Sequence, residues 1–448
     1  MEPLKYLDNE MESTIFYKEE QAPLHNRKGL KIKRYELLIL SFLAKEKLLT
    51  SQQLLRLVHL YEPNKPINSL NNRIRKFEKY QLVGIRAPNI RLLGDSNKVF
   101  VRPAGYQLLV KYNFLPSSWA NKKRAEGLLI RNLDHFLAIK EITVQSYIAA
   151  LRYKRFATVH TSHYYLNNSI NSIRPDALIT LDKLDGHEDT RMFLNIEVDS
   201  GSEPQQTIID KVQSYVAIAK RYPNDEHLVL FATIDQSLIV RNQSSIVGER
   251  RVANLKMILG EVATTLNNLH IVVLPLKDMR QWIDIFYAQP LMIYGTRKKE
   301  MFERIPRLLN ILPDSSFPYQ LKIQDKSNLL PKEVNSDKVV MELYKFISTS
   351  SNSHETVLIL GIEKGNVSDH YLLLRIARLL ERYSFRLPVT RIIALYPTKE
   401  DAEKDIIGSA FSKDILITTT DEIGNAIITG TLTGFHQKLA FTKERVEF

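Results

Sequence analysis

The sequence predicts a multidomain protein of the α/β class, and three observations lead to that prediction. The chain has 448 residues, enough for two to four domains of roughly 100–200 residues each. From about residue 126 onward, apolar stretches with the spacing of strands alternate with amphipathic helical stretches, which is typical of α/β layers. The first part of the chain differs, because it is strongly basic and begins with three short helical stretches. We therefore expect three domains, at residues 30–115, 126–290 and 335–448.

Composition excludes several kinds of site. The chain has no cysteine, so disulfide frameworks, zinc ribbons, iron–sulfur sites and thiol nucleophiles are excluded. The first residues lack the apolar core of a signal peptide, and no stretch approaches the roughly 18 consecutive apolar residues of a membrane span. We therefore expect a cytoplasmic protein without a membrane partner.

The positive charge is concentrated in one part of the chain. The whole chain has 62 Lys and Arg against 50 Asp and Glu, whereas residues 27–125 alone have 21 against 5. A segment this basic is typical of proteins that bind a polyanion, because each neutralised phosphate releases counterions. We expect double-stranded DNA as the partner, and a merely solvated basic surface remains the alternative.

Three helices and a hairpin follow one another in this basic segment. Apolar spacing predicts a first helix at 34–45, and Thr50 and Asn68 are placed to cap a second and a third helix, the third at 69–82. Residues 83–102 then alternate around a central turn, which predicts a β-hairpin. This order predicts a winged helix, a fold that binds DNA in many proteins and other proteins elsewhere.

The third of these helices has the composition of a DNA-recognition helix. One side is apolar, while Asn, Arg and Lys occupy the rest. Arg forks onto guanine and Asn onto adenine in the major groove, and Lys mostly contacts phosphate. The residues expected to contact DNA, in this helix and in the hairpin, are Asn71, Asn72, Arg73, Arg75, Lys76, Lys79, Arg86, Arg91, Lys98 and Arg102.

The central segment predicts the order α, β, β, β, α, β. The expected elements are a helix at 128–152, strands at 157–165, 175–181 and 192–199, a helix at 205–221 and a strand at 227–234. A helix that ends at Leu266 and a strand at 269–274 would complete the sheet. At least one crossover is expected between neighbouring strands.

Two charged residues stand at positions in this segment where the pattern calls for apolar ones. Glu141 falls within the apolar stripe of the long helix, and Lys211 shares a helical face with Ile208 and Tyr215. Burying such charges is costly unless they are paired or face a polar cleft. We therefore assign both residues to a candidate catalytic site.

Two carboxylates on strands complete this candidate site. Asp176 opens one strand, and Glu197 lies on another strand, where it shares a face with Asn195 and Asp199. If the strands are neighbours, Asp176 and Glu197 are placed to bind a hard divalent cation, Mg²⁺ or Mn²⁺. That cation would activate water at a scissile phosphate. No nucleotide or organic cofactor is indicated, because glycine-rich phosphate-binding motifs are absent.

This arrangement resembles the PD-(D/E)XK nuclease superfamily. Pro175-Asp176 is similar to its first strand motif, and Glu197-Val198-Asp199 stands where Glu-X-Lys is expected. The resemblance implies a catalytic set of Glu141, Asp176, Glu197 and Lys211. In that set Glu141 is the additional glutamate of the first helix, and Lys211 supplies the cation because Asp199 replaces the lysine of the motif.

The segment from residue 34 to about residue 222 also resembles the replication-relaxation family of plasmid and conjugative-element proteins. The resemblance rests on the winged helix, the helix that begins near Asp134-His135, the run Arg174-Pro175-Asp176, and the run from Glu197 to Glu203 followed by Lys211 and Tyr215. It implies a role in the replication or mobilisation of extrachromosomal DNA.

Simpler structural roles remain open for the same residues. Asp199 could cap the following helix, and Asp176 could be an ordinary first residue of a strand. Glu141 and Lys211 could form one structural ion pair. His135 projects away from the stripe that contains Glu141, which favours a structural or surface role.

The C-terminal part predicts a small α/β domain behind a linker. Prolines mark the expected linker from Pro306 to Pro331. Helices are expected at 339–347 and 371–383, and strands at 357–361, 391–395 and 415–419. No internal repeat is apparent. Protein contact or homodimerisation is the expected role of this domain.

Two classes of function fit these patterns. The first is a DNA-binding accessory protein of plasmid or mobile-element replication or mobilisation, with a degenerate nuclease-like domain and with replication, transfer or recombination proteins as partners. The second is a metal-dependent DNA endonuclease that uses Asp176, Glu197 and Lys211. A nicking assay on supercoiled plasmid with Mg²⁺ or Mn²⁺ separates the two.

Overall fold

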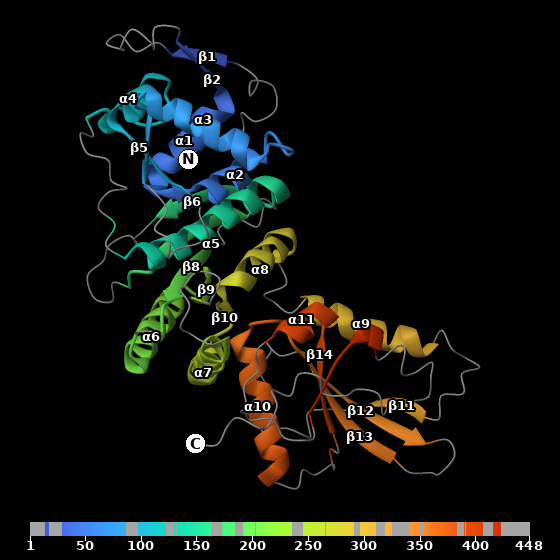
Figure 1. Cartoon of the computed structure of the whole chain (residues 1–448). Coiled ribbons are helices and arrows are strands. Elements are labelled where there is room, and N and C mark those ends of the chain that lie inside the picture. The colour runs from blue at the N-terminus through green and yellow to red at the C-terminus, as the bar shows by residue number, and fades with distance from the viewer. Residues whose placement is uncertain are drawn as a thin grey trace.

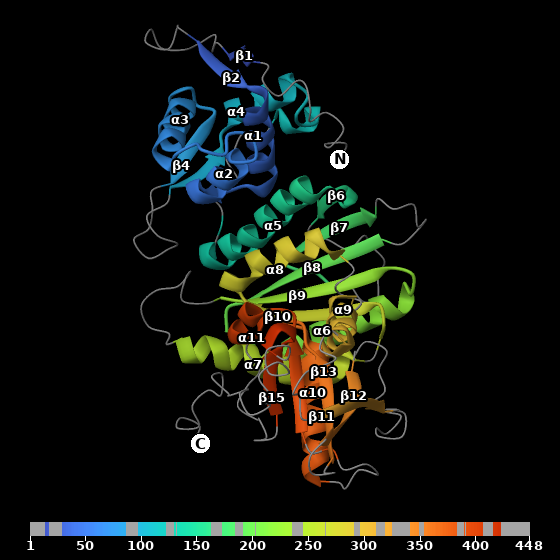
Figure 2. The same ribbon diagram turned by 90° about the vertical axis from the view of Figure 1, so that its right-hand side faces the viewer.

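The chain is a multidomain α/β protein in the computed structural model shown in Figure 1 and Figure 2. The described residues are 14–17, 29–86, 97–121, 130, 132–162, 173–183, 191–201, 203–234, 245–264, 266–290, 296–310, 319–324, 341–348, 354–382, 389, 391–405 and 415–422. Their strands form a two-stranded, a three-stranded and two five-stranded sheets. Within these residues no helix is both long enough and apolar enough to span a membrane.

The N-terminal unit, residues 29–121, packs helices against a small antiparallel sheet. Its helices are α1 (Arg34–Glu46), α2 (Ser51–Val58), α3 (Ile67–Lys79) and α4 (Pro103–Lys111). Its strands β3 (Leu49–Thr50), β4 (Val83–Arg86) and β5 (Lys98–Val101) lie in the order β3-β5-β4. Ahead of α1, strand β2 (Leu30–Lys33) pairs antiparallel with β1 (Thr14–Tyr17). The three expected helices and two strands of the expected hairpin are therefore confirmed.

Local sequence explains where two of these helices begin and end. Thr50 caps α2 as expected, because its side chain accepts from the Gln53 backbone N–H while the Gln53 side chain accepts from the Thr50 N–H. The expected Asn68 cap is wrong: α3 begins at Ile67 directly after the extended Pro66. The helix ends at Lys79 and not at residue 82, because Gln81 adopts a left-handed conformation with φ of 56°.

The central unit, residues 132–290, is a three-layer structure around a five-stranded sheet. Its strands are β6 (Phe156–Ser162), β7 (Ala177–Lys183), β8 (Arg191–Asp199), β9 (Glu226–Thr233) and β10 (Leu269–Pro275). They lie in sequence order, antiparallel from β6 to β8 and parallel from β8 to β10. Its helices are α5 (Leu133–Tyr153), α6 (Gln205–Arg221), α7 (Ser245–Ala263) and α8 (Leu276–Ala288). The expected order of elements is confirmed.

The two faces of this sheet bury different helices. Apolar side chains of α5 and α8 pack on the face formed by residues such as Ile196 and Leu230. Those of α6 and α7 pack on the opposite face, against residues such as Val229 and Ile271. Figure 2 shows α5 and α8 together on one side of the sheet. This arrangement leaves the carboxyl ends of β8 and β9 as the edge where side chains from several helices meet.

Helix α5 contributes to two hydrophobic cores at once. Its Ala138 and Ile142 belong to the core of the central sheet, whereas its Val144 and Ile148 belong to the core of the N-terminal unit. A buried ion pair between Lys140 and Glu46, with Nζ and Oε2 2.5 Å apart, also joins α5 to α1. In both views α5 accordingly lies between the N-terminal unit and the sheet.

The C-terminal unit, described between residues 296 and 422, holds the second five-stranded sheet. Its strands are β11 (Tyr319–Gln324), β12 (Met341–Ser348), β13 (His354–Gly361), β14 (Arg391–Tyr396) and β15 (Ile415–Thr419), again in sequence order. Its helices are α9 (Thr296–Asn310), α10 (Val367–Arg382) and α11 (Lys399–Lys404). Figure 1 shows this unit, coloured orange and red, beside α7 and β10.

Two expectations for this region are wrong. Pro306 lies inside α9 and residues 319–324 form β11, so the stretch 306–331 is not a plain linker. The expected helix at 339–347 is strand β12, which pairs antiparallel with β11 on one side and β13 on the other. Both errors have one cause: the strand is selected by pairing with distant neighbours, and the local pattern alone did not distinguish it from a helix.

Candidate functional site

A cluster of charged side chains lies at the carboxyl end of β8. Strands β7 and β8 are neighbours, and Ala177 pairs with Ile196, so Asp176 stands beside the end of β8. The Asp176 Oδ2 accepts a hydrogen bond from the Val198 backbone N–H at 2.8 Å. Asp176 and Glu197 therefore lie close together, as the sequence pattern anticipated for neighbouring strands.

Glu197 is buried within this cluster and is held by two partners from α6. Its Oε1 accepts from the Tyr215 hydroxyl at 2.6 Å, and its Oε2 lies 3.1 Å from the Lys211 Nζ. Because the carboxyl is only 2% exposed, burial raises the pKa of Glu197 to about 7 despite the nearby lysine. Lys211 also contacts Glu203 at 2.9 Å, and the two carboxylates raise the pKa of Lys211 although partial burial opposes them.

His135, near the start of α5, also belongs to this cluster. Its Nε2 lies 3.0 Å from the Val198 carbonyl oxygen and 3.3 Å from the Asp176 Oδ2. The hydrogen bond to Asp176 raises the pKa of His135. Sequence reasoning favoured a structural or surface role for this residue because it judged only the stripe around Glu141. A second stripe, in which His135 precedes Ala138 and Ile142, carries the signal that was missed.

Asp199 is held by an arginine that sequence reasoning did not single out. Arg251 of α7 places its Nε 2.6 Å from one Asp199 oxygen and a terminal nitrogen 3.1 Å from the other. Asp199 also accepts from the Gly201 backbone N–H at 3.0 Å, whereas the N-cap of α6 is Pro204. Asp199 therefore shapes a turn and pairs with Arg251, and does not cap α6. No local pattern points to Arg251, which is 52 positions away along the chain.

Glu141 lies outside this cluster, contrary to its assignment as a catalytic residue. Its Oε2 contacts Arg56 at 2.6 Å and the Gln53 side chain at 3.1 Å, both on α2. The apolar stripe around Glu141 faces the N-terminal unit and not the sheet, which is the physical reason for the error. The proposed ion pair between Glu141 and Lys211 is wrong for the same reason.

Most carboxylate oxygens of the cluster are engaged by protein groups in this arrangement. Both oxygens of Glu197 and one oxygen of Asp176 already accept hydrogen bonds from protein groups. Asp199 is neutralised by Arg251, and among the described residues no group of three or more His, Asp or Glu is placed to hold a metal ion. Mg²⁺ is usually held by one or two carboxylates together with waters and phosphate oxygens. Lysine, arginine and histidine are the counter-charges of these carboxylates here, and the assignment of Asp176 and Glu197 as metal ligands stays a prediction.

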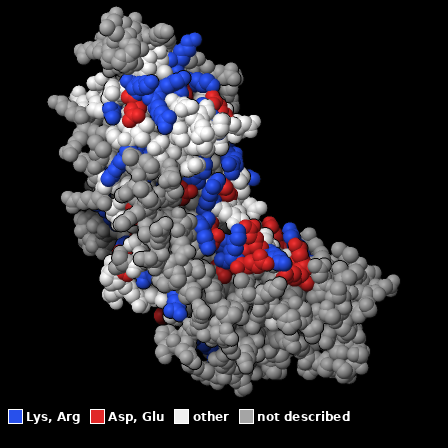
Figure 3. Space-filling model, in the orientation of Figure 1, with Lys and Arg blue, Asp and Glu red and all other residues white. Residues whose placement is uncertain are grey.

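A second candidate surface is the basic face of α3. Leu70, Ile74 and Phe77 bury one side of the helix. The other side exposes Asn72, Arg75, Lys76 and Lys79, with Asn71 partly buried. Figure 3 shows Lys and Arg gathered over this part of the N-terminal unit. Of the residues expected to contact DNA from this helix, Asn72, Arg75, Lys76 and Lys79 have the accessibility that the role requires.

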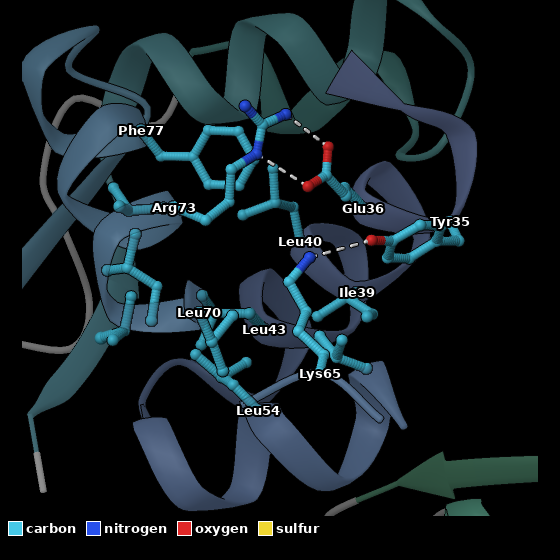
Figure 4. Close-up of a pocket in the computed structure, with 14 residues that line it drawn as sticks. Tyr35, Glu36, Ile39, Leu40, Leu43, Leu54, Lys65, Leu70, Arg73 and Phe77 are labelled. Carbon is cyan, nitrogen blue, oxygen red and sulfur yellow. Dashed lines mark hydrogen bonds and ion pairs between the residues drawn. The ribbon is translucent and has the colours of Figure 1, made fainter. Parts of the chain in front are cut away.

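Arg73 has a structural position, although it lies on the same helix. Its guanidinium makes a bidentate ion pair with Glu36, at 2.8 and 2.6 Å, and also donates to the Lys31 carbonyl at 2.5 Å. It stacks over the Phe77 ring, 4.6 Å from its centroid. Figure 4 shows Arg73 turned toward Glu36 above a small apolar pocket. These contacts fix α3 on α1, so Arg73 is already engaged within the protein.

The hairpin residues differ in accessibility. Arg86 is exposed, and Arg102 is half-buried and donates to the Gln81 side chain. Lys98 is 1% exposed, and burial lowers its pKa, so its assignment to a DNA-contacting surface is wrong in this structure. The reason is that β5 is the middle strand of its sheet. Arg91 lies outside the described residues.

Comparison with known proteins finds one family model that matches part of the chain. Residues 40–232 match the family model described as replication-relaxation. The match begins within α1 and ends near the end of β9, so it includes the basic helix and the charged cluster apart from Arg251. The resemblance to the replication-relaxation family noted from the sequence is thereby confirmed over these residues. A search of curated proteins found no significant match.

Proposed function

We propose that this protein is a DNA-binding accessory factor in the replication or mobilisation of plasmids or other mobile elements, and that it acts beside replication, transfer or recombination proteins. In this proposal the N-terminal unit is a winged helix that binds double-stranded DNA through α3. The central unit is a degenerate nuclease-like scaffold. The match of residues 40–232 to the replication-relaxation family supports this setting.

The observation that carries the proposal is the two-sided character of α3. Its apolar side is locked into the core, and Arg73 fixes its orientation through Glu36. The opposite side presents Arg75, Lys76 and Lys79 to solvent. A rigid helix that displays cations and an asparagine suits a major groove bordered by phosphates.

The state of the charged cluster supports the scaffold part of the proposal. The cluster retains Asp176 and Glu197 side by side at the end of neighbouring strands, as a nuclease-like site requires. Yet each carboxylate is matched by a protein cation or histidine: Lys211, Arg251 and His135. In a cluster paired in this way, removing one partner would leave an uncompensated buried charge.

DNA binding is tested with the variant Arg75→Ala/Lys76→Ala/Lys79→Ala. We expect weaker binding to duplex DNA and a shallower dependence on salt, because the slope of log K against log [salt] falls by about 0.9 for each phosphate that the variant no longer neutralises. The matched control is Lys220→Ala/Arg221→Ala/Lys299→Ala, which removes three exposed charges from α6 and α9. Equal slopes for the two variants would refute the assignment, provided that thermal melting shows both to be folded.

A metal-dependent endonuclease is the second candidate, and the proximity of Asp176, Glu197 and Lys211 favours it. Nicking of supercoiled plasmid with Mg²⁺ or Mn²⁺, lost in Glu197→Gln, would establish it. Asp199→Lys would restore the lysine of the PD-(D/E)XK motif. Made alone, this change would place the new lysine against Arg251, which contacts Asp199 in the wild type. The informative variant is therefore Asp199→Lys/Arg251→Met. Under the scaffold proposal the wild type does not nick DNA. Nicking by the folded double variant would indicate that the rest of the nuclease site is intact and that Asp199 and Arg251 keep it inactive.

A further inference from the structure

The two five-stranded sheets have the same topology. In each, a helix precedes three strands joined antiparallel, and two further strands extend the sheet in parallel: β6 to β10 in the central unit and β11 to β15 in the C-terminal unit. A helix lies between the third and fourth strands and another between the fourth and fifth, namely α6 and α7 in the first and α10 and α11 in the second. The order α, β, β, β, α, β, α, β therefore occurs twice.

The leading helices also occupy corresponding faces. Helix α5 packs on the face of β8 that is opposite α6. In the second sheet, α10 packs on the face of Leu358 and Leu360. Helix α9 approaches the opposite face, since a Cβ on Gly361 would lie 3.0 Å from Lys298 and 3.1 Å from Phe302. The two sheets thus agree in strand order, strand direction and the side on which each of these helices packs.

On the face that meets α10, the described end of β13 carries apolar side chains where β8 carries polar and charged ones. The face of β8 toward the α6 layer carries Asn195, Glu197 and Asp199 at its end. The matching face of β13 and the residue after it carry Leu358, Leu360 and Ile362, which pack with α10. Because these positions differ in chemistry, no repeat is visible in the sequence although the topology repeats.

We propose that the C-terminal unit is a second copy of the central fold that has exchanged the charged site for a docking surface, and that it seals the edge strand of the first copy. Strand β10 is the edge of the central sheet, and its residues are buried. The segment 362–366, which joins β13 to α10, lies along this strand. Val273 donates its backbone N–H to the Gly365 carbonyl at 2.9 Å, and Val272 forms a bridge with Asn366.

The close approach depends on glycine at position 365. Gly365 has a φ of 79°, and a Cβ placed there would lie 2.7 Å from the Leu274 side chain. The corresponding connection of the central sheet, between β8 and α6, contains Gly201 with the same φ of 79°. A Cβ on Gly201 would meet nothing within 4 Å. The same backbone conformation is thus used against a neighbouring strand in one copy and beside the charged cluster in the other.

A buried group of polar side chains fixes the docking surface. Lys256 of α7 contacts Asp405 at 2.7 Å, and Asp405 also accepts from His370 and Tyr396, at 2.7 and 3.0 Å. Asp405 in addition accepts from the Gly365 backbone N–H at 3.1 Å. All four side chains are almost completely buried, so separating the units would leave charges without partners.

Sealing this edge has a clear physical benefit. An uncovered edge strand rich in Ile, Val and Leu presents unpaired backbone groups to any other chain and promotes intermolecular pairing. The C-terminal copy fills that place within the same chain. This inference is independent of the DNA-binding proposal, because its evidence lies in β10, α7 and the C-terminal unit and not in α3.

The test compares Gly365→Val with Gly201→Val in the full chain. Both variants strain a residue at the same φ, but only the first forces Leu274 away. We expect Gly365→Val to speed hydrogen exchange in residues 269–275 by about tenfold or more, which corresponds to roughly 1.4 kcal/mol. We also expect its mass in solution, from light scattering, to exceed that of the wild type. Gly201→Val should change neither quantity.

A second variant covers the case in which Gly365→Val does not fold. Lys256→Met removes the buried cation of the docking surface and leaves the close approach at Gly365 intact. Faster exchange in residues 269–275, with less change in the other strands of the central sheet, would support the proposal. Unchanged exchange there in the folded variants, or a mass that stays at the wild-type value while β10 exchanges freely, would overturn it.

Discussion

At the end of its third strand the central sheet carries Glu197, and just beyond the third strand of the C-terminal sheet stands Glu363. Burial raises the pKa of each to about 7. Their surroundings differ, since Lys211 beside Glu197 is 28% exposed, whereas Lys298 of α9, which lies against the second sheet, is 1% exposed. The same topology therefore has one edge that reaches solvent and one that is closed. Topology alone does not determine whether such an edge serves as a site or as packing.

The largest expected effect separates the two edges through their lysines. Lys298→Met leaves Asp369, which lies 2.7 Å from Lys298 and is fully buried, without its cation. Breaking a buried pair in this way costs about 3–5 kcal/mol in the free energy of unfolding. Lys211→Met should cost clearly less below pH 7, because Glu197 can hold a proton there. Urea denaturation of both variants at pH 6 measures the two losses in the free energy of unfolding. Equal losses would contradict the proposed difference between the two sheet edges.

A smaller effect is expected from the glutamates and depends on pH. Because the pKa of Glu363 in the folded protein lies above its ordinary value of 4.5, stability falls as pH rises from about 4.5 to about 7 and then levels off. Glu363→Gln removes this loss, so the variant should gain up to roughly 3 kcal/mol over the wild type across that window. Glu197→Gln should show the same direction. In both variants the gain is reduced, because Arg297 or Lys211 loses a charged partner. A gain in stability that shrinks as pH rises would contradict the raised pKa of the substituted glutamate.

The smallest effect concerns the face of α5 that turns away from the sheet. Glu141→Gln keeps a hydrogen-bonding group toward Arg56 and Gln53 but removes a partly exposed ion pair, which should cost about 0.5–1 kcal/mol. The titration of His135, followed by NMR, should not move, because Glu141 lies outside the cluster. Glu46→Gln is the control on the same helix interface: it disrupts the buried pair with Lys140 and should cost several times more.

Local patterns predicted much of this molecule, and their failures have physical causes. Alternation and helical spacing are local, so the elements of the central sheet and the pairing of Asp176 with Glu197 could be read from them. Helix α5 has two apolar stripes, and choosing the wrong one misplaced both Glu141 and His135. Arg251 could not be found, because its contact with Asp199 exists only after α7 has packed.

The C-terminal sheet shows the limit of the same reasoning. Strand β12 is defined by its two neighbours, and its local pattern also fits a helix. The repeat of the fold was invisible for a related reason, since Leu358 and Leu360 replaced the polar side chains that would have signalled it. Strand order and direction persist when the side chains that reveal them in a sequence do not.

The shared helix α5 has a mechanical consequence. It spans 21 residues, or about 30 Å at 1.5 Å per residue, and both of its sides are clamped by packed cores. A movement of the N-terminal unit would therefore move α5 together with the central sheet. His135 lies in the first turn of α5 and contacts Val198 and Asp176. A displacement of the N-terminal unit along α5 would therefore reach the charged cluster through the imidazole ring of His135.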